Sequence, residues 1–321
     1  MCSPEHATLP LMRLRDLGEF GLIDRIQRLA AEVQGRDVVL GIGDDAALLR
    51  PRRGEDLVVT SDAMVEGTHF RWDGETPRTL GRRALAANLS DLAAMGSRPM
   101  GFTFALAAPP SLEVRRVTGI VRGMLDLAGS FACPLVGGNV TRARETSINI
   151  TALGGVRPGQ ALMRSGALPG DRILVTGKLG ISALERARGR IRTIPTPRVA
   201  EGRALARIAS VTACIDISDG LLADLAHLLE ASGVGAEIDA RRVPTPRGFG
   251  AACRRLKRDP LRMALGGGED YELLFTVTGK PPTLEALERR LGTSVTAIGR
   301  ITERGLHICG SSGKLPGWRH F

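Results

Sequence analysis

The chain has few aromatic residues, no long apolar run and no closely spaced cysteines. Aromatic side chains make up 3% of its 321 residues, too few for the extensive stacking platforms that bind single-stranded nucleic acid. No segment approaches 18 uninterrupted apolar residues, so we expect no transmembrane helix. Residues 1–6 have neither the charged start nor the apolar core of a secretory signal. These absences predict a cytoplasmic protein that is not attached to a membrane.

The cysteines give no indication of a metal site or a disulfide framework. They are Cys2, Cys133, Cys214, Cys253 and Cys309. No two of them form a C-x-x-C pair, which argues against structural zinc, and a chain of this length does not need disulfides to fold. We expect reduced and mostly buried thiols.

Lysine is also scarce, although the chain is strongly basic. Only four of the 44 basic residues are lysines, and the formal net charge is +10. The arginines are scattered in doublets such as Arg52-Arg53 and Arg82-Arg83 rather than gathered in one basic arm. A general preference for arginine explains this pattern better than a nucleic-acid footprint. We therefore expect no nucleic-acid partner.

Strand and helix patterns alternate in both halves of the chain, which predicts layered α/β domains. A chain of 321 residues is long enough for two domains, and the segment 155–159 (GVRPG) is typical of a boundary. We expect a flexible lead-in over residues 1–17, an N-terminal domain over 18–155 and a C-terminal domain over 156–321.

Local signals place several elements. Thr76 and Pro77 mark the start of a helix, and Gly96 stands where its C-terminal cap is expected. A second helix is predicted from Ser111, as N-cap, to Phe131. A strand is predicted over residues 269–277.

Two apolar runs, residues 38–40 and 57–60, end in acidic residues that stand beside glycine or small hydroxyls. Asp44 and Asp45 follow the first run, and Asp62 follows the second. Carboxylates so close together repel one another, so we expect a divalent cation to neutralise them. Hard oxygen ligands select Mg²⁺, which usually joins one or two carboxylates to substrate phosphates. We favour Asp45 and Asp62 as ligands and Asp44 as a residue that shapes the turn.

The glycines in this region suggest a dinucleotide-binding fingerprint, but the neighbouring residues exclude it. A Rossmann unit needs a crossover helix, and residues 46–56 are too few and contain Pro51 and Gly54. Residues 176–179 (TGKL) lack the spacing and the hydroxyl of a P-loop, and the chain has no His-Arg-Asp catalytic loop. Nucleotide chemistry must therefore use metal and backbone contacts.

Three further acidic turns repeat the pattern, at residues 88–92, 216–220 and 266–272. Each has a structural explanation by itself: Ser218 or Asp219 can cap a helix, and Asp91 can be a solvated helical charge. Together with the first turn they indicate a phosphate site. Glycine lets backbone N–H groups approach a phosphate, and carboxylates hold Mg²⁺ beside it.

In combination, these segments resemble the thiamine-monophosphate kinase family, whose superfamily includes aminoimidazole ribonucleotide synthetase and selenophosphate synthetase. The matching segments follow the family order over nearly all of residues 18–321, and their combination is highly specific although no single segment is. They are residues 18–20, 41–45, 60–62, 69–70, 86–96, 137–138, 164–167, 216–220 and 267–273.

The resemblance implies a role for individual residues. It implies that several Mg²⁺ ions are held by Asp45, Thr60, Ser61, Asp62, Asp91, Asn139, Asp216 and Asp219. It implies that ATP is contacted by Gly138, Asn139, Arg164 and Ser218. It implies that thiamine monophosphate is contacted by His69, Glu269 and Trp318.

The resemblance also implies the fold and the activity. We expect the two-domain fold of aminoimidazole ribonucleotide synthetase, in which N-terminal sheets pair across a homodimer to form a shared barrel and the C-terminal domain is an α/β sandwich. We expect an enzyme, a thiamine-phosphate kinase, that uses ATP as co-substrate and transfers its phosphoryl group directly and in line to thiamine monophosphate. The product is thiamine diphosphate.

One position departs from the family pattern. The family has Gly-Gly-Asp-Thr where this chain has Gly137-Gly138-Asn139-Val140. Asparagine keeps a carbonyl oxygen but loses the charge, so we expect weaker binding of one Mg²⁺. This leaves two alternatives: another ATP-using enzyme of the same superfamily, or a catalytically weakened nucleotide-binding protein. A selenophosphate synthetase would need a lysine near Cys2, and the first lysine is Lys178.

Overall fold

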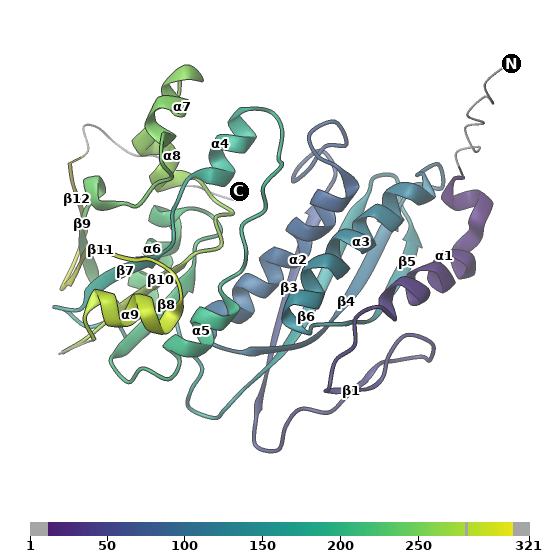
Figure 1. Cartoon of the computed structure of the whole chain (residues 1–321), viewed down its shortest axis with the longest axis horizontal. Coiled ribbons are helices and arrows are strands. Elements are labelled where there is room, and N and C mark those ends of the chain that lie inside the picture. The colour runs from purple at the N-terminus through teal and green to yellow at the C-terminus, as the bar shows by residue number, and fades with distance from the viewer. Residues whose placement is uncertain (1–11, 280–281, 311–321) are drawn as a thin grey trace, which may run out of the picture.

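The N-terminal half is a four-stranded sheet with two long helices packed on one face (Figure 1). The structure is a computed structural model, and its description extends over residues 12–279 and 282–310. The strand order is β3-β6-β4-β5, and only β4 and β5 are parallel. The strands are β3 (Asp56–Val65), β4 (Arg98–Ala108), β5 (Leu135–Arg142) and β6 (Ser147–Val156), and the helices are α2 (Pro77–Ala94) and α3 (Val114–Phe131).

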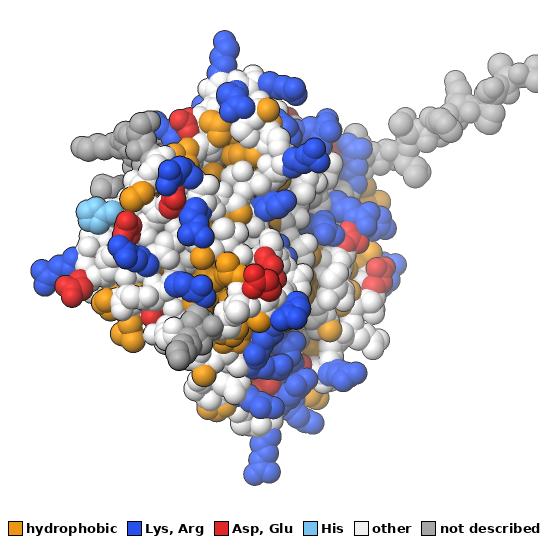
Figure 2. Space-filling model, turned by 60° about the vertical axis from the view of Figure 1, so that its left-hand side comes forward, with side chains coloured by type: hydrophobic (Ala, Val, Ile, Leu, Met, Phe, Trp, Pro, Cys, Tyr) orange, Lys and Arg blue, Asp and Glu red, His pale blue; other side chains and the backbone are white. Residues whose placement is uncertain are grey.

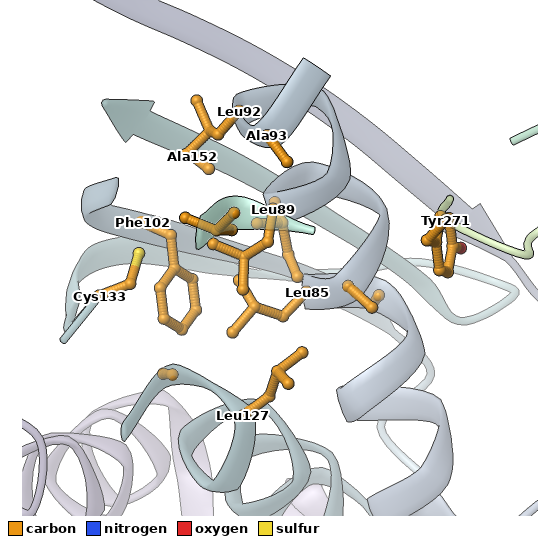
Figure 3. Packing of buried hydrophobic residues seen from close by; sticks show 14 of the residues in the cluster. Leu85, Leu89, Leu92, Ala93, Phe102, Leu127, Cys133, Ala152 and Tyr271 are labelled. Carbon is orange, nitrogen blue, oxygen red and sulfur yellow. The ribbon is translucent and has the colours of Figure 1, made fainter. Parts of the chain in front are cut away.

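The two helices approach each other closely because glycines face the partner backbone. A Cβ on Gly81 would lie 1.9 Å from the carbonyl oxygen of Ile120, and a Cβ on Gly123 would lie 2.0 Å from that of Arg78. Beneath them, leucines of α2 pack on the sheet, as Figure 3 shows for Leu89 beside Phe102. This packing fixes α2, which carries Asp91, against β3.

The ends of α2 agree with the local signals, because those signals act within the chain segment itself. Thr76 is the N-cap, and its side chain accepts from the N–H of Thr79. At the other end Gly96 has a φ of 66° and donates to Ala93 O at 2.9 Å, while Ser97 donates to Leu92 O at 2.9 Å. These two bonds form a Schellman motif.

The start of α3 differs from the prediction of Ser111 as N-cap. The helix begins at Val114 with Glu113 as N-cap. Glu113 is held in an extended conformation because it pairs with Arg13, and the N–H of Val114 donates to Met12 O at 2.9 Å. This tertiary contact therefore moves the start of the helix further along the chain, to Val114. Residues 12–15, which lie within the expected lead-in, bond to residues 110–114, and helix α1 covers Leu14–Ala30.

A short hairpin carries the first acidic turn. Strand β1 (Val38–Leu40) pairs antiparallel with β2 (Leu48–Leu49), so residues 41–47 form the loop between them. An antiparallel hairpin cannot be the parallel βαβ unit of a dinucleotide-binding fold. The exclusion of the Rossmann interpretation is confirmed.

The C-terminal half is a six-stranded sheet of order β12-β9-β11-β7-β10-β8, antiparallel except between β12 and β9. Its strands are β7 (Arg172–Thr176), β8 (Val211–Asp216), β9 (Gly235–Asp239), β10 (Leu273–Val277), β11 (Val295–Thr302) and β12 (Leu306–Cys309). The helices are α4 (Ile181–Ala187), α5 (Val199–Leu205), α6 (Leu221–Ser232), α7 (Phe249–Arg255), α8 (Pro260–Gly266) and α9 (Leu284–Leu291).

Both faces of this second sheet are buried, which makes the C-terminal half a sandwich. Ile173 and Leu274 belong to a cluster with α6, α7 and α8, while Leu174 and Phe275 belong to the cluster that continues into the N-terminal half. Helix α2 packs on α5 and β8, so the two halves share one core. The layered, mixed α/β architecture is confirmed.

The expectations about transmembrane helices and about the cysteines concern, in the structure, residues 12–279 and 282–310. No helix in these ranges is long and apolar enough to cross a membrane. The cysteines in these ranges are free: Cys133, Cys214 and Cys253 are buried and Cys309 is exposed.

Candidate functional site

Three elements that are distant in the sequence bring their acidic residues together. Strand β3 carries Thr60 and Asp62, helix α2 carries Asp91, and strand β8 ends in Asp216. Thr60 Oγ1 donates to Asp91 Oδ2 at 2.5 Å, and Ser90 Oγ donates to Asp216 Oδ2 at 2.6 Å. We call Thr60, Asp62, Asp91, Asp216 and Asp219 the acidic cluster.

Alternation along β3 decides which of its side chains reach this cluster. Successive side chains of a strand point to opposite faces, so Thr60 and Asp62 share a face and Ser61 has the other. Ser61 Oγ instead donates to Ile150 O at 3.1 Å and lies 3.1 Å from Thr151 Oγ1. The predicted ligand Ser61 therefore does not present its hydroxyl to the acidic cluster.

The cluster is electrostatically strained because carboxylates are buried near one another. Burial and then the charge of Asp216 raise the pKa of Asp91 to about 7, although the bond from Thr60 opposes the rise. Burial also raises the pKa of Asp216 to about 7. Burial and the charge of Asp219 raise the pKa of Asp62. Carboxyls in this state lack a sufficient positive partner.

The geometry of the cluster suits metal sites whose ligands come partly from substrate and water rather than from the protein alone. In the described ranges, no three His, Cys, Asp or Glu side chains are grouped so that they could hold one ion. Asp45 remains in the exposed β1–β2 loop, where its N–H donates to Asp44 Oδ1 at 2.8 Å. That bond fits the role we predicted for Asp44 in shaping the turn.

The turn at residues 216–220 is built around a carboxylate that the sequence analysis missed. Asp224 Oδ2 accepts from the N–H groups of Ser218 at 3.0 Å, Asp219 at 3.1 Å and Gly220 at 3.0 Å. These three donors are therefore occupied and do not form a phosphate-binding cradle, contrary to our expectation for this turn. Asp224 instead fixes the backbone that carries Ser218 and Asp219.

The turn at residues 266–272 is irregular where a strand was predicted from residue 269. Strand β10 begins only at Leu273. Glu269 has a φ of 63° and Tyr271 a φ of 52°, both in the left-handed region that side chains other than glycine rarely adopt. The conformation is held by backbone bonds from Glu269 N to Ser218 O at 2.7 Å and from Tyr271 N to Ile217 O at 3.0 Å. Such strain is typical of functional sites.

The residues predicted to contact ATP lie on two segments. Gly138 and Asn139 are exposed on β5, the edge strand of the N-terminal sheet. Gly138 also has a packing reason, since a Cβ there would lie 1.9 Å from Phe104 O. Arg164 is exposed but close to the acidic cluster: burial raises the pKa of Asp91 and of Asp216, and the charge of Arg164 opposes both rises.

Two of the three residues predicted to contact substrate meet through a third residue. Arg83 donates to the backbone oxygen of His69 at 2.8 Å and to Glu269 Oε1 at 2.9 Å. Trp318, the third predicted contact, lies outside the described residues. Arg83 had no distinguishing signal in a sequence with so many arginines. Asp224 had one, because it follows the turn by four residues on the next helix.

Two layered halves with a cluster of oxygen-bearing side chains where they meet place the chain among the AIR synthase related proteins. Residues 43–156 match the N-terminal domain model of AIR synthase related proteins, and residues 169–309 match the C-terminal domain model. Several solved structures of hydrogenase maturation protein HypE share the fold, one with a TM-score of 0.74 at 20% identity over 94% of this chain.

Closer relatives identify the branch of this class. The thiamine-monophosphate kinase of Mycobacterium tuberculosis is 36% identical over 96% of this chain and 93% of its own length, and that of Escherichia coli K12 is 39% identical over 89% and 90%. The crystal structure of the Stenotrophomonas maltophilia K279a enzyme has a TM-score of 0.78 and 40% identity, and covers 92% of this chain and 98% of its own. The chain belongs to the thiamine-monophosphate kinase family.

One further solved relative was determined with ligands. It is described as AaThiL complexed with AMPPCP and TMP, and it has a TM-score of 0.73 and 31% identity over 98% of this chain and all of its own. That protein therefore holds both an ATP analogue and TMP in a fold that this chain shares.

The raised pKa of Asp91 predicts a pH dependence of stability in the absence of divalent cations. The folded carboxyl has a pKa of about 7 against an ordinary value of 3.8, so the folded protein binds the extra proton between these values. Stability therefore falls as pH rises from about 4 to about 7 and levels off above 7, with a slope of at most about 1.4 kcal/mol per pH unit for one group. In EDTA, we expect the Tm to fall less between pH 5.5 and 8 for Asp91→Asn, which keeps an acceptor for Thr60. Equal slopes would contradict this explanation.

Asp224 is expected to matter more than an exposed acid on the same helix. Burial raises the pKa of Asp224 to about 7, so the oxygen that accepts the three backbone bonds matters more than the charge. Asp224→Ala removes that acceptor, and a buried N–H left without a partner costs roughly 1–3 kcal/mol. Glu230→Ala is the matched control on α6, where Glu230 is exposed. We expect a lower Tm for Asp224→Ala and an unchanged Tm for the control. Equal Tm values would show that the turn does not need Asp224.

Proposed function

We propose that this chain is an ATP-dependent kinase that converts thiamine monophosphate to thiamine diphosphate by direct, in-line phosphoryl transfer. The observation that carries the proposal is the acidic cluster, where oxygen ligands from β3, α2 and β8 face one another in partial burial. The membership of the chain in the thiamine-monophosphate kinase family supports the choice of substrate.

The acceptor explains why a site rich in carboxylates needs no general base. A phosphate monoester has a second pKa near 6, so at pH 7 its oxygen is already largely ionised and can attack directly. The barrier comes from bringing two anions together, and catalysis consists of positioning and charge neutralisation. Arg164 is the positive side chain that lies close enough to the cluster to act on this charge.

The residues of the cluster fit Mg²⁺. The donors are oxygens only, and the raised pKa values of Asp62, Asp91 and Asp216 reflect burial and mutual repulsion that a cation relieves. When bound, Mg²⁺ would neutralise charge between carboxylates and phosphates. Because no three acidic side chains converge in the described part of the chain, phosphate and water would complete the coordination. Asp45 would join these ligands from the β1–β2 loop. Asn139 lies in one row with Ala105, Asn149 and Ala63, on the face of the sheet opposite Thr60 and Asp62, so it would hold an ion from that other face.

At the substrate end, Glu269 would act as an oriented acceptor rather than as an isolated charge. Its carboxylate is already paired with Arg83 at 2.9 Å and with Arg186 at 2.7 Å. We propose that His69 and Glu269 contact the organic part of the substrate, and that Trp318 packs on its cationic ring.

We propose a homodimer formed by the open face of the N-terminal sheet, and a domain boundary near residue 156. On β3, Leu57 and Val59 have exposed fractions of 52% and 56% on the face opposite α2, which is the apolar surface that a second copy would cover.

Basic side chains are spread over the face seen in Figure 2 with acidic ones between them, so we propose small anions rather than nucleic acid as partners. We also propose a cytoplasmic location.

The direct test is the formation of product. Purified protein with ATP, Mg²⁺ and thiamine monophosphate is expected to yield thiamine diphosphate, separated by chromatography, whereas thiamine without phosphate is expected to yield none. Asp216→Asn should lower the rate by about 100-fold or more, because it removes a buried carboxylate that would hold Mg²⁺ beside the transferred phosphoryl group. Wild-type protein that forms no thiamine diphosphate would refute the proposal.

Asn139 separates full activity from a weakened, nucleotide-binding role. If the missing charge limits the enzyme, Asn139→Asp will raise the rate about tenfold and lower the Mg²⁺ concentration needed for half-maximal rate. Asn149→Asp is the control, because β6 places Asn149 in the same row of the sheet, paired with Ala105 as Asn139 is. No change in Asn139→Asp would show that the asparagine is tolerated.

A further inference from the structure

Arg83 is a buried, charged side chain of the site. The phosphoryl-transfer chemistry proposed above assigns no role to it. It lies on α2 with an exposed fraction of 2%. A charge can be buried at this depth only if it is paired and hydrogen-bonded. Burial lowers the pKa of Arg83, but the charges of Glu269 and Glu75 outweigh this and raise it overall. The guanidinium therefore stays charged and fixed.

The partners of Arg83 come from both halves of the molecule. Nη2 donates to Glu75 Oε1 at 2.6 Å and to the backbone oxygen of His69 at 2.8 Å, both in the N-terminal half. Nη1 donates to Glu269 Oε1 at 2.9 Å and Oε2 at 3.2 Å, in the C-terminal half. One planar group thus fixes the distance between His69 and Glu269.

We propose that Arg83 is a positioning residue that sets the spacing of the two sides of the organic subsite for thiamine monophosphate. The inference rests on the proposed function. Backbone bonds hold the left-handed turn at Glu269, and the direction of its carboxylate is set by its ion pairs with Arg83 and Arg186. Arg83 holds this carboxylate from beneath, while Arg186 reaches the same carboxylate from a more exposed position, with a side-chain exposure of 36%.

The planar fork of arginine is required for this task. Arg83 uses Nε, Nη1 and Nη2 together, with Nε donating to Glu75 Oε2 at 3.3 Å. A lysine keeps the charge but has one nitrogen, which cannot reach His69, Glu75 and Glu269 with the same geometry. Arg83→Lys therefore separates geometry from charge.

The test compares Arg83→Lys with Arg82→Lys, the neighbouring position on α2, which forms no ion pair with the residues in 12–279 and 282–310. The dissociation constant of thiamine monophosphate is measured by calorimetry in the presence of Mg²⁺ and a non-hydrolysable ATP analogue. We expect Arg83→Lys to raise it about tenfold or more while the affinity for the analogue changes by less than about twofold, and Arg82→Lys to change neither. Equal loss of both affinities, or no loss, would overturn the proposal.

Glu75→Gln keeps the proposal testable if Arg83→Lys does not fold. Among the described residues, both hydrogen bonds to the Glu75 carboxylate come from Arg83. This variant therefore weakens the contacts that hold Arg83 on the side away from Glu269. We expect a rise in the dissociation constant of thiamine monophosphate of about three- to tenfold. An unchanged value would overturn the proposal.

A double-mutant cycle shows whether Arg83 acts through Glu269. If it does, adding Arg83→Lys to Glu269→Gln will weaken binding by less than about twofold beyond Glu269→Gln alone. Fully additive effects would overturn the proposal. Wild-type protein that binds thiamine monophosphate but forms no product would refute the kinase activity alone, whereas wild-type protein that does not bind it would refute both inferences.

Discussion

The structure depends on the burial of several carboxylates in one place. Asp91 and Asp216 come from different halves of the chain, and burial is the largest cause of the raised pKa of each. A chain with a net charge of +10 could have paired these acids with arginines, as it pairs Glu272 with Arg198. It leaves them with hydroxyl partners and one peripheral arginine. The proposed binding of a cation and phosphates would offset the free energy cost of that choice.

Two further carboxyl groups hold the backbone of the site by accepting hydrogen bonds from its loops. Asp224 accepts three N–H groups of the turn that follows β8. Asp270 does the same for the start of α4, where it accepts from Gly180 N at 2.6 Å and Ser182 N at 3.3 Å. The acidic residues of these turns therefore divide into two groups: those that face the acidic cluster, and those that shape the loops presenting it.

Arg83 joins the two segments that we propose to recognise the organic part of the substrate, those of His69 and Glu269. The strands and helices place Asp62 and Asp91 through regular geometry, but Glu269 stands in an irregular turn with a left-handed backbone. A buried arginine that also holds His69 gives such a turn a defined position. The same guanidinium joins the two halves, so substrate recognition and domain packing share one interaction.

The sequence by itself determined features that act over short distances. Thr76, Pro77 and Gly96 set the ends of α2, and the alternation of apolar residues set the layered class. Tertiary structure decided what depends on partners far along the chain. The pairing of Arg13 with Glu113 moved the start of α3, and the packing of α2 on β3 and β8 selected Asp62, Asp91 and Asp216 from the acids. Arg83 is the clearest case, because only folding brings it to Glu269, which lies 186 residues further along the chain.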